Sequence, residues 1–218
     1  MSGADRPPRT LPPVQRSWRL LVLTLGLALP SVLSCSSQEA PSPEAAPPTS
    51  VAPGDPAALE PLVLDEAPTG FTVAADDVGR TGATDLAAAA GDAGDPGAAE
   101  ALSDAGFVRG WQRLWVSDDD EDELFLIVYE FADAGGATAF FDRTAGEPAK
   151  EGGEGVFDVP GLPGAVGLDG GGDGLSVAAV IATTGPYLVQ VIGNGPDPGP
   201  SRGTVVALVS AQVERLTS

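Results

Sequence analysis

The densest group of potential metal ligands in this 218-residue chain is a run of six carboxylates, residues 118–123. Asp118, Asp120 and Asp122 stand at alternate positions, which imitates the start of a calcium-binding loop. Glu123, however, occupies the place where such a loop needs glycine for its sharp turn, and a strand pattern follows at once. We therefore interpret the run as a solvated hairpin turn. Asp118, Asp120 and Asp122 stay weak candidates for a low-affinity divalent cation site.

A second group combines aromatic and basic side chains. Strand-like alternation over residues 107–116 places five side chains on one face: Phe107, Arg109, Trp111, Arg113 and Trp115. Arginine beside tryptophan can hold an anionic or carbohydrate ligand through stacking and cation–π contacts. Alternate aromatic residues on a strand usually pack beneath a helix instead. We therefore expect this face to lie in the core, with its arginines paired to neighbouring carboxylates, and we keep a ligand surface as the alternative.

Motifs for other kinds of catalysis are missing from the sequence. The chain contains no histidine, which excludes serine–histidine triads, imidazole metal ligands and the usual general base at neutral pH. The Gly-Gly-Gly-Asp-Gly run at residues 170–174 lacks the following helix that a phosphate-binding loop needs, so we expect a flexible turn there. A pair of carboxylates can hydrolyse glycans, but with 31 acidic residues some pair will be close by chance. We expect no catalytic residue and no cofactor, and the alternative is a carboxylate-dependent glycan hydrolase of the envelope.

The N-terminal residues have the order of an export signal. Four arginines precede an apolar segment that begins at Leu20, and Cys35, the only cysteine in the chain, follows that segment. The arginines favour a cytoplasmic position for this end, so the residues after Cys35 are expected on the outer side of the membrane. Pro30 interrupts the apolar run, which is shorter than the ~20 residues of a spanning helix. A cleaved signal peptide over residues 1–34 therefore fits better than an uncleaved membrane anchor.

The residues Val32-Leu33-Ser34-Cys35 resemble the lipobox of bacterial lipoproteins, in which an aliphatic, a tolerant and a small position precede the cysteine. The resemblance implies that the Cys35 sulfur receives a diacylglyceryl group and that cleavage leaves Cys35 at the N-terminus. Two acyl chains supply the two signals that stable membrane attachment needs. A free cysteine can also be an ordinary buried apolar residue, but that interpretation leaves its position after the signal unexplained. The resemblance implies a location and an anchor, and no activity.

The chain after the signal is strongly acidic. From Cys35 onward, 7 Lys and Arg stand against 30 Asp and Glu, a net charge near −23. Such a surface repels the phosphates of nucleic acid and anionic lipid headgroups, so we expect no nucleic-acid partner and membrane contact through the lipid alone. It favours a basic envelope protein or a divalent cation as partner, although charge also serves solubility by itself. We therefore expect a noncatalytic binding or interaction module on the extracytoplasmic face of the cell membrane.

Composition divides the chain into three parts. Residues 35–58 are rich in proline and small polar residues and contain no aromatic residue. They cannot bury enough apolar surface to offset the entropy of ordering, so we expect a lipidated, disordered tether that stays semi-extended. Residues 59–218 are long enough to form one acidic domain with its own core.

Hydrophobic patterns in that domain predict both strands and helices. Strands are expected at 70–74, 107–116, 124–131, 156–159, 175–183 and 187–192. Residues 85–90 and 95–104 predict one or two alanine-rich helices, and further helices are expected from 133 and from 201. Asp95 and Asp133 are the expected N-caps. Two helical stripes should face the core, one formed by Ala137, Phe140, Phe141 and Thr144 and one by Val206, Val209, Val213 and Leu216.

The strands at 107–116 and 124–131 should form one hairpin, and those at 175–183 and 187–192 a second one that turns at Thr184-Gly185-Pro186. Because hairpins outnumber crossovers, we expect a single-domain α+β fold with a mainly antiparallel sheet of two hairpins and helices packed against it. This order of elements is similar to the α/β/α sandwich of PsbP-like and Mog1-like bacterial lipoproteins.

Overall fold

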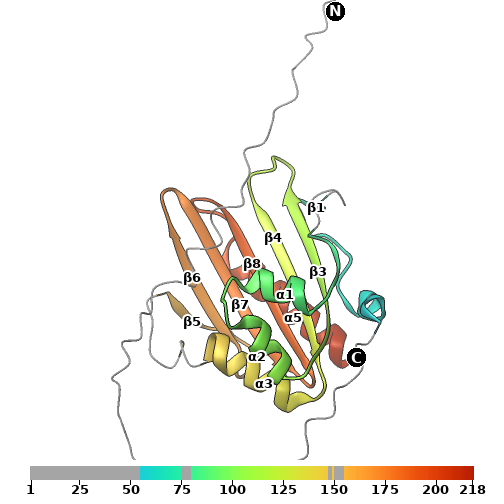
Figure 1. Ribbon diagram of the computed structural model, residues 1–218. Helices are drawn as coiled ribbons and strands as arrows, with labels where there is room; N and C mark the ends of the chain where they lie inside the picture. The colour runs from blue at the N-terminus through green and yellow to red at the C-terminus, as the bar shows by residue number, and fades with distance from the viewer. Residues whose placement is uncertain (1–54, 75–79, 147–148, 150–154) are drawn as a thin grey trace, which may run out of the picture. The chain divides into compact units, whose positions relative to one another are not determined.

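Eight β-strands form one antiparallel sheet, and helices cover both of its faces (Figure 1). The structure is a computed structural model that describes residues 55–74, 80–146, 149 and 155–218. The predicted signal peptide, the lipobox with Cys35 and most of the predicted tether lie outside the described residues. The predicted α+β class and the mainly antiparallel sheet are confirmed. The last tether residues, 55–58, already belong to the first folded turn.

In chain order the elements are the 3₁₀ helix η2 (Pro56–Leu62), strands β1 (Phe71–Val73) and β2 (Gly82–Thr84), helices α1 (Leu86–Ala93) and α2 (Ala98–Asp104), strands β3 (Phe107–Ser117) and β4 (Glu123–Phe131), helix α3 (Ala134–Phe141) with its π-helical extension η4 (Asp142–Gly146), strands β5 (Val156–Asp158), β6 (Val166–Gly172), β7 (Leu175–Thr184) and β8 (Tyr187–Pro196), and helix α5 (Arg202–Thr217). The strand order is β1-β3-β4-β8-β7-β6-β5, and β2 also pairs with β3. Both predicted hairpins, β3–β4 and β7–β8, are present and join along β4 and β8. No helix of the described residues is long and apolar enough to cross a bilayer.

Side-chain caps fix the starts of three helices. Asp85 accepts a hydrogen bond from Ala88 N at the start of α1, Asp133 from Gly136 N at α3, and Ser201 from Thr204 N at α5, with distances of 2.9, 2.9 and 3.2 Å. Each bond satisfies an N–H group that the helix itself leaves unpaired. The predicted cap at Asp95 is wrong. Its carboxylate accepts from Gly97 N at 3.0 Å and closes a turn before α2, which begins at Ala98 with Gly97 as its N-cap.

One face of the sheet packs against η2 and α5. Its core contains both tryptophans of β3 together with Leu59 and Val63 at the N-terminal end of the domain. The buried side of α5 is formed by Val205, Leu208, Val209 and Gln212. Of the predicted stripe only Val209 is fully buried, while Val206, Val213 and Leu216 are partly buried at its margin. The prediction left out Gln212 because this residue is polar. Its side chain is nevertheless completely buried and hydrogen-bonded, so the buried side of α5 differs from the predicted stripe.

The opposite face carries α1, α2 and α3 (Figure 1). Phe140 of α3 packs against Tyr129 and Phe131 of β4, with ring centroids 6.5 and 5.6 Å apart. The predicted stripe holds for Ala137, Phe140 and Phe141, but Thr144 is exposed and Ala145 is buried instead. The cause is the π-helical turn η4, in which one extra residue per turn shifts the buried position along the chain.

The glycine run before β7 forms a strand where a flexible turn was expected. Gly170, Gly171 and Gly172 belong to β6 and pair with β7. The turn consists of Asp173 and Gly174 alone, whose φ angles of 53° and 80° are those of a two-residue hairpin loop. Strand β6 was not predicted, because glycine has low strand propensity. In the structure, hydrogen bonds to β7 hold these glycines in a strand.

Two glycines in helices should respond oppositely to alanine. A Cβ on Gly136 would lie 2.0 Å from the Ala105 carbonyl oxygen, where α3 meets the end of α2, whereas a Cβ on Gly91 in α1 would meet nothing within 4 Å. We expect Gly136→Ala to lower the free energy of unfolding by about 1–3 kcal/mol, because backbone must shift. Gly91→Ala should raise it by roughly 0.5–1 kcal/mol. Urea unfolding of both variants measures the difference, and equal effects would contradict the packing of α3 on α2.

Candidate acidic and tryptophan-arginine sites

The acidic run forms the turn between β3 and β4, as expected. Ser117 organises it: its hydroxyl donates to Asp119 Oδ1 at 2.5 Å and accepts from Asp122 N at 2.9 Å. Asp120 has a φ of 60°, in the left-handed region that asparagine and aspartate tolerate better than most residues. The turn is therefore held by its own side chains and needs no ion to close it.

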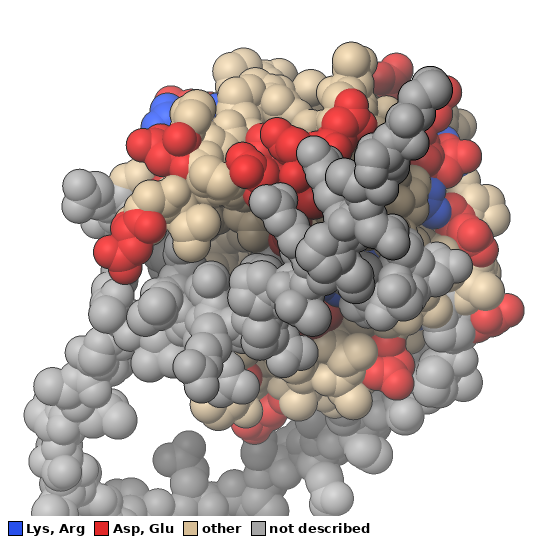
Figure 2. Space-filling model, turned by 90° about the horizontal axis from the view of Figure 1, so that it is seen from above, with Lys and Arg blue, Asp and Glu red and all other residues tan. Residues whose placement is uncertain are grey.

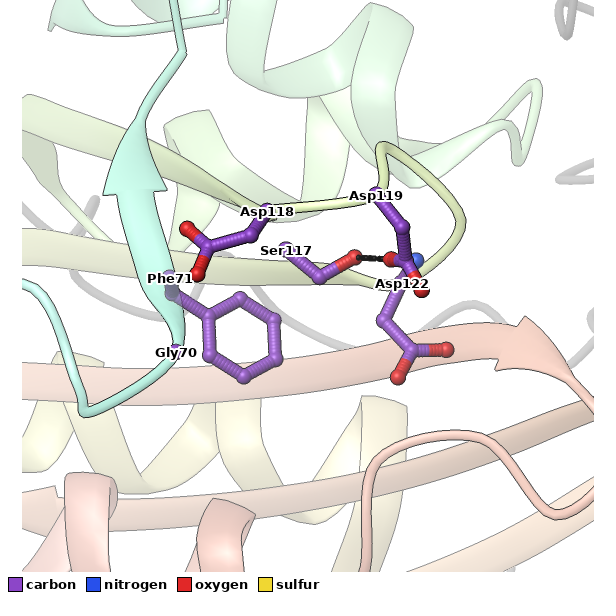
Figure 3. A pocket seen from close by; sticks show the side chains of 6 residues that line it. All are labelled: Gly70, Phe71, Ser117, Asp118, Asp119 and Asp122. Carbon is purple, nitrogen blue, oxygen red and sulfur yellow. Dashed lines mark hydrogen bonds between the residues drawn. The ribbon is translucent and has the colours of Figure 1, made fainter.

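An open hollow of about 360 Å³ lies beside this turn, lined by Gly70, Phe71, Ser117, Asp118, Asp119 and Asp122 (Figure 3). Of the three residues predicted as weak cation ligands, Asp118 and Asp122 line the hollow and Asp120 does not. Across the described ranges, no three acidic or cysteine side chains are grouped closely enough to hold a metal ion. The ring of Phe71 supplies an apolar surface beside the carboxylates.

Two carboxyl groups of the hollow have pKa values displaced in opposite directions. The Ser117 hydroxyl, followed by the Glu121 backbone N–H, donates to Asp119 and lowers the pKa of its carboxyl below the usual range. Burial raises the pKa of Asp122, and the charge of Asp119 adds to that shift. Asp122 is partly buried because it lies over Gly195 of β8, where a Cβ would be only 1.9 Å from Asp122 Oδ1.

A second hollow, of about 420 Å³, lies between the end of α3 and the edge strand β5. Its lining includes Phe141, Val156 and Phe157, and two carboxylates, Asp142 and Asp158. Asp142 stands in the π-helical turn η4, and its Oδ1 lies over a glycine of the same turn, where a Cβ would be 2.7 Å away. This hollow could not be predicted from the sequence, because its carboxylates come from a helix end and a strand that only the tertiary fold brings together.

The tryptophan and arginine face of β3 lies in the core. Trp115 is fully buried and Trp111 keeps 8% of its surface exposed. Arg109 pairs with Glu130 at 2.5 Å, as expected, and donates to the backbone oxygen of Asp55 at 2.9 Å. The expectation of a carboxylate partner is wrong for Arg113, for which no ion pair is found within the described part of the chain. The core position of the tryptophans removes the exposed ligand surface that was the alternative.

No protein-family model matches this chain, and no curated protein matches it. Among solved structures, it is similar to the extracellular domain of PknH from Mycobacterium tuberculosis. The TM-score is 0.47 at 16% sequence identity, and the match covers 75% of this chain and 98% of that one.

Acidic side chains are conspicuous at the end of the domain that bears the β3–β4 turn. Figure 2 shows this end: beside the grey residues, Asp and Glu form a patch above the centre of the view and stand at several places along its edge, and few Lys or Arg are visible. Both hollows share this character: among the described residues that line them none is basic, and each combines carboxylates with at least one aromatic residue. A complementary ligand would carry positive charge and some apolar surface.

Proposed function

We propose that this chain is a lipid-anchored lipoprotein of the bacterial cell envelope that binds a basic protein partner without catalysing a reaction. The lipobox-like residues ending in Cys35 support the anchor. The proline-rich tether would hold the domain away from the bilayer on its extracytoplasmic side. The acidic domain would then be the binding module.

The observation that carries the binding proposal is the composition of the two hollows. Each offers two or more carboxylates beside an aromatic ring, and no Lys or Arg is among the described residues that line it, although Arg202 stacks on the Phe157 ring of the second hollow. Lysine and arginine side chains have the complementary character, because an aliphatic stem or planar guanidinium packs on apolar surface while the charge meets a carboxylate. A divalent cation is a weaker candidate, since the carboxylates of the described residues do not converge on one point.

A glycan hydrolase fits the same carboxylates less well. Displaced pKa values at Asp119 and Asp122 have the directions expected for a base and an acid. The Asp119 oxygen, however, accepts bonds from Ser117 and from the Glu121 backbone, so it is used to hold the turn. The hollow is also open, whereas catalytic carboxylates gain their effect in a closed site that excludes water.

The anchor is tested by intact-mass analysis of protein extracted from membranes, beside Cys35→Ala and Ser36→Ala variants. We expect the parent and Ser36→Ala proteins to begin at Cys35 with added acyl mass and to stay with the membrane. Cys35→Ala should carry no acyl mass, because it lacks the sulfur that would be lipidated. A parent protein that retains residues 1–34 without lipid would refute the lipoprotein assignment.

Binding is tested with a fluorescent arginine- and phenylalanine-rich peptide as the probe. We expect the double variant Asp142→Asn, Asp158→Asn to bind at least about tenfold more weakly than the parent at low salt, because two carboxylates leave one hollow. The matched control is Asp104→Asn, Glu100→Asn, which removes the same charge from α2, outside both hollows. Equal loss in both double variants would mean that net charge alone attracts the probe, and would refute a site in this hollow.

A further inference from the structure

Strand β5 forms the edge of the sheet beyond β6 (Figure 1). Just before β5, the Gly155 carbonyl oxygen accepts a hydrogen bond from Asp169 N of β6 at 2.8 Å. Main-chain groups of an antiparallel strand point alternately toward its neighbour and away from it. The N–H and C=O groups of Val156 and Asp158 therefore point outward, away from β6. Within the described part of the chain, no hydrogen bond to these four outward groups is found.

The opposite edge of the sheet is less open. Strand β1 forms part of it, and a bond from Ala74 N to Leu114 O at 2.9 Å shows which of its groups meet β3. The outward groups of β1 belong to Phe71 and Val73. The N–H group of Phe71 is already used, because it donates to Pro68 O at 3.0 Å. Strand β2, on the same edge, packs against η2. A further strand would thus find more main-chain partners at β5.

The two faces of β5 differ in charge. Val156 and Asp158 leave the strand on one face because they alternate with Phe157. Both line the second hollow, which Asp142 of η4 lines as well. On the other face the guanidinium of Arg202 lies over the Phe157 ring, 4.6 Å from its centroid. The face of Val156 and Asp158 is therefore the one that favours a positively charged side chain.

Charge also decides between two kinds of additional strand. Edge strands are commonly protected from pairing by proline, lysine or a bulge. The sequence of β5 is Val-Phe-Asp, and its register with β6 is regular, so it has none of these three. Its one charge, on Asp158, repels an acidic strand and attracts a basic one. A second copy of this chain, with a net charge near −23 after the signal, is therefore a poor occupant.

We infer that the basic partner binds as an extended segment that adds one more strand to the sheet along β5. Main-chain bonds to Val156 and Asp158 would supply affinity, and side chains at alternate positions would supply specificity. A lysine or arginine opposite Asp158 would have its Cβ atom about 5 Å from that of Asp158, beside the hollow that Asp142 lines. The inference rests on the proposed function and adds the manner in which the partner binds.

N-methylation of a peptide probe separates strand addition from attraction by charge. The probe is a fluorescent peptide of alternating arginine and phenylalanine, in which a slip by one residue would turn the arginines away from Asp158. Two further forms carry backbone N-methyl groups at the odd or at the even positions, with the charge unchanged. We expect one form to bind at least about tenfold more weakly than the other, because only alternate N–H groups face β5.

The outcomes distinguish this inference from the proposed function. Equal binding of the two methylated forms would overturn strand addition, and a basic partner would still be supported by binding of the unmodified peptide. Absence of binding by the unmodified peptide would refute the proposed function and this inference together.

Val156→Pro tests the same edge from the side of the protein. Proline removes the outward N–H group of Val156, which β6 does not use, so the strand should still form. We expect the unmodified peptide to bind at least about tenfold more weakly. The matched control is Val73→Pro, which removes an outward N–H group from β1 at the other edge and should bind as the parent does. Equal affinity of the two variants would overturn the inference.

Amide hydrogen exchange of the parent chain needs no variant. Without peptide, we expect the amides of Val156 and Asp158 to exchange faster than that of Phe157, which faces β6. Saturating peptide should slow the two outward amides at least about tenfold. Outward amides that exchange slowly without peptide would mean that this chain, or a second copy of it, already covers the edge, and would overturn the inference. Outward amides that stay fast with peptide bound would overturn it as well.

Discussion

Replacement of Trp115 by alanine is expected to lower the free energy of unfolding by about 3–5 kcal/mol, the largest stability loss among the substitutions considered for this fold. The side chain is fully buried between the sheet and the layer formed by η2 and α5. It stands opposite Leu124 in the β3–β4 ladder, so its removal leaves a cavity in the middle of the core. For a domain of this size the thermal midpoint should fall by roughly 6–20 °C.

Val73→Ala is the matched control for this variant. Val73 pairs with Trp115 across β1 and β3, but 45% of its surface is exposed. We expect its loss to cost under about 1 kcal/mol, because a half-exposed edge position contributes little more than strand propensity. Urea unfolding measured side by side decides the matter. Similar midpoints for the two variants would contradict the core position of the tryptophan face.

Replacement of Gln212 by leucine should destabilise the protein by about 2–4 kcal/mol, although it makes a buried position more apolar. The Gln212 side chain accepts from Leu64 N at 2.9 Å and donates to the Leu62 carbonyl oxygen at 2.8 Å. Both backbone groups would lose their partner, and each partly buried group left unpaired costs about 1–3 kcal/mol. Hydrogen exchange of the Gln212→Leu variant would show where the destabilisation begins. We expect the Leu64 amide to exchange faster than the amides at the centre of β4.

Ser210→Ala is the control for this variant. It shows whether removing any polar side chain from α5 destabilises the protein as Gln212→Leu does. The Ser210 hydroxyl donates only to Val206 O of its own helix, at 2.7 Å, so we expect a change within about 0.5 kcal/mol. If Gln212→Leu were as stable as Ser210→Ala, the contact between α5 and the segment after η2 would be of little energetic value.

Much of the fold could be predicted from residues that are close together in the sequence. The run before Phe131 is apolar on both faces, and β4 lies inside the sheet with β3 and β8 beside it. Asp133 caps its helix as predicted. The turn of the second hairpin contains Gly185, whose φ of 52° is positive. These features depend on residues close together in the chain, which is why pattern and propensity revealed them.

The errors have a common physical origin in contacts between distant residues. Gln212 is buried because Leu62 and Leu64, about 150 positions earlier, need its amide. The same dependence hid both the hollow between α3 and β5 and the missing partner of Arg113, since neither follows from spacing along one element. The lipidation of Cys35 remains a prediction.

The attachment of η2 determines how the domain would respond to tension along the chain. A pull transmitted through residues before Asp55 reaches η2 first, and η2 is bound by separate side chains: Arg109 at Asp55, Arg215 at Pro61, and Gln212 at Leu62 and Leu64. These bonds stand in sequence along the pulled segment, so they would be loaded one after another, together with the buried contacts of Leu59 and Val63, whereas the paired strands would be loaded together. Detachment of η2 would expose the Trp111 and Trp115 face to solvent while the sheet stayed folded.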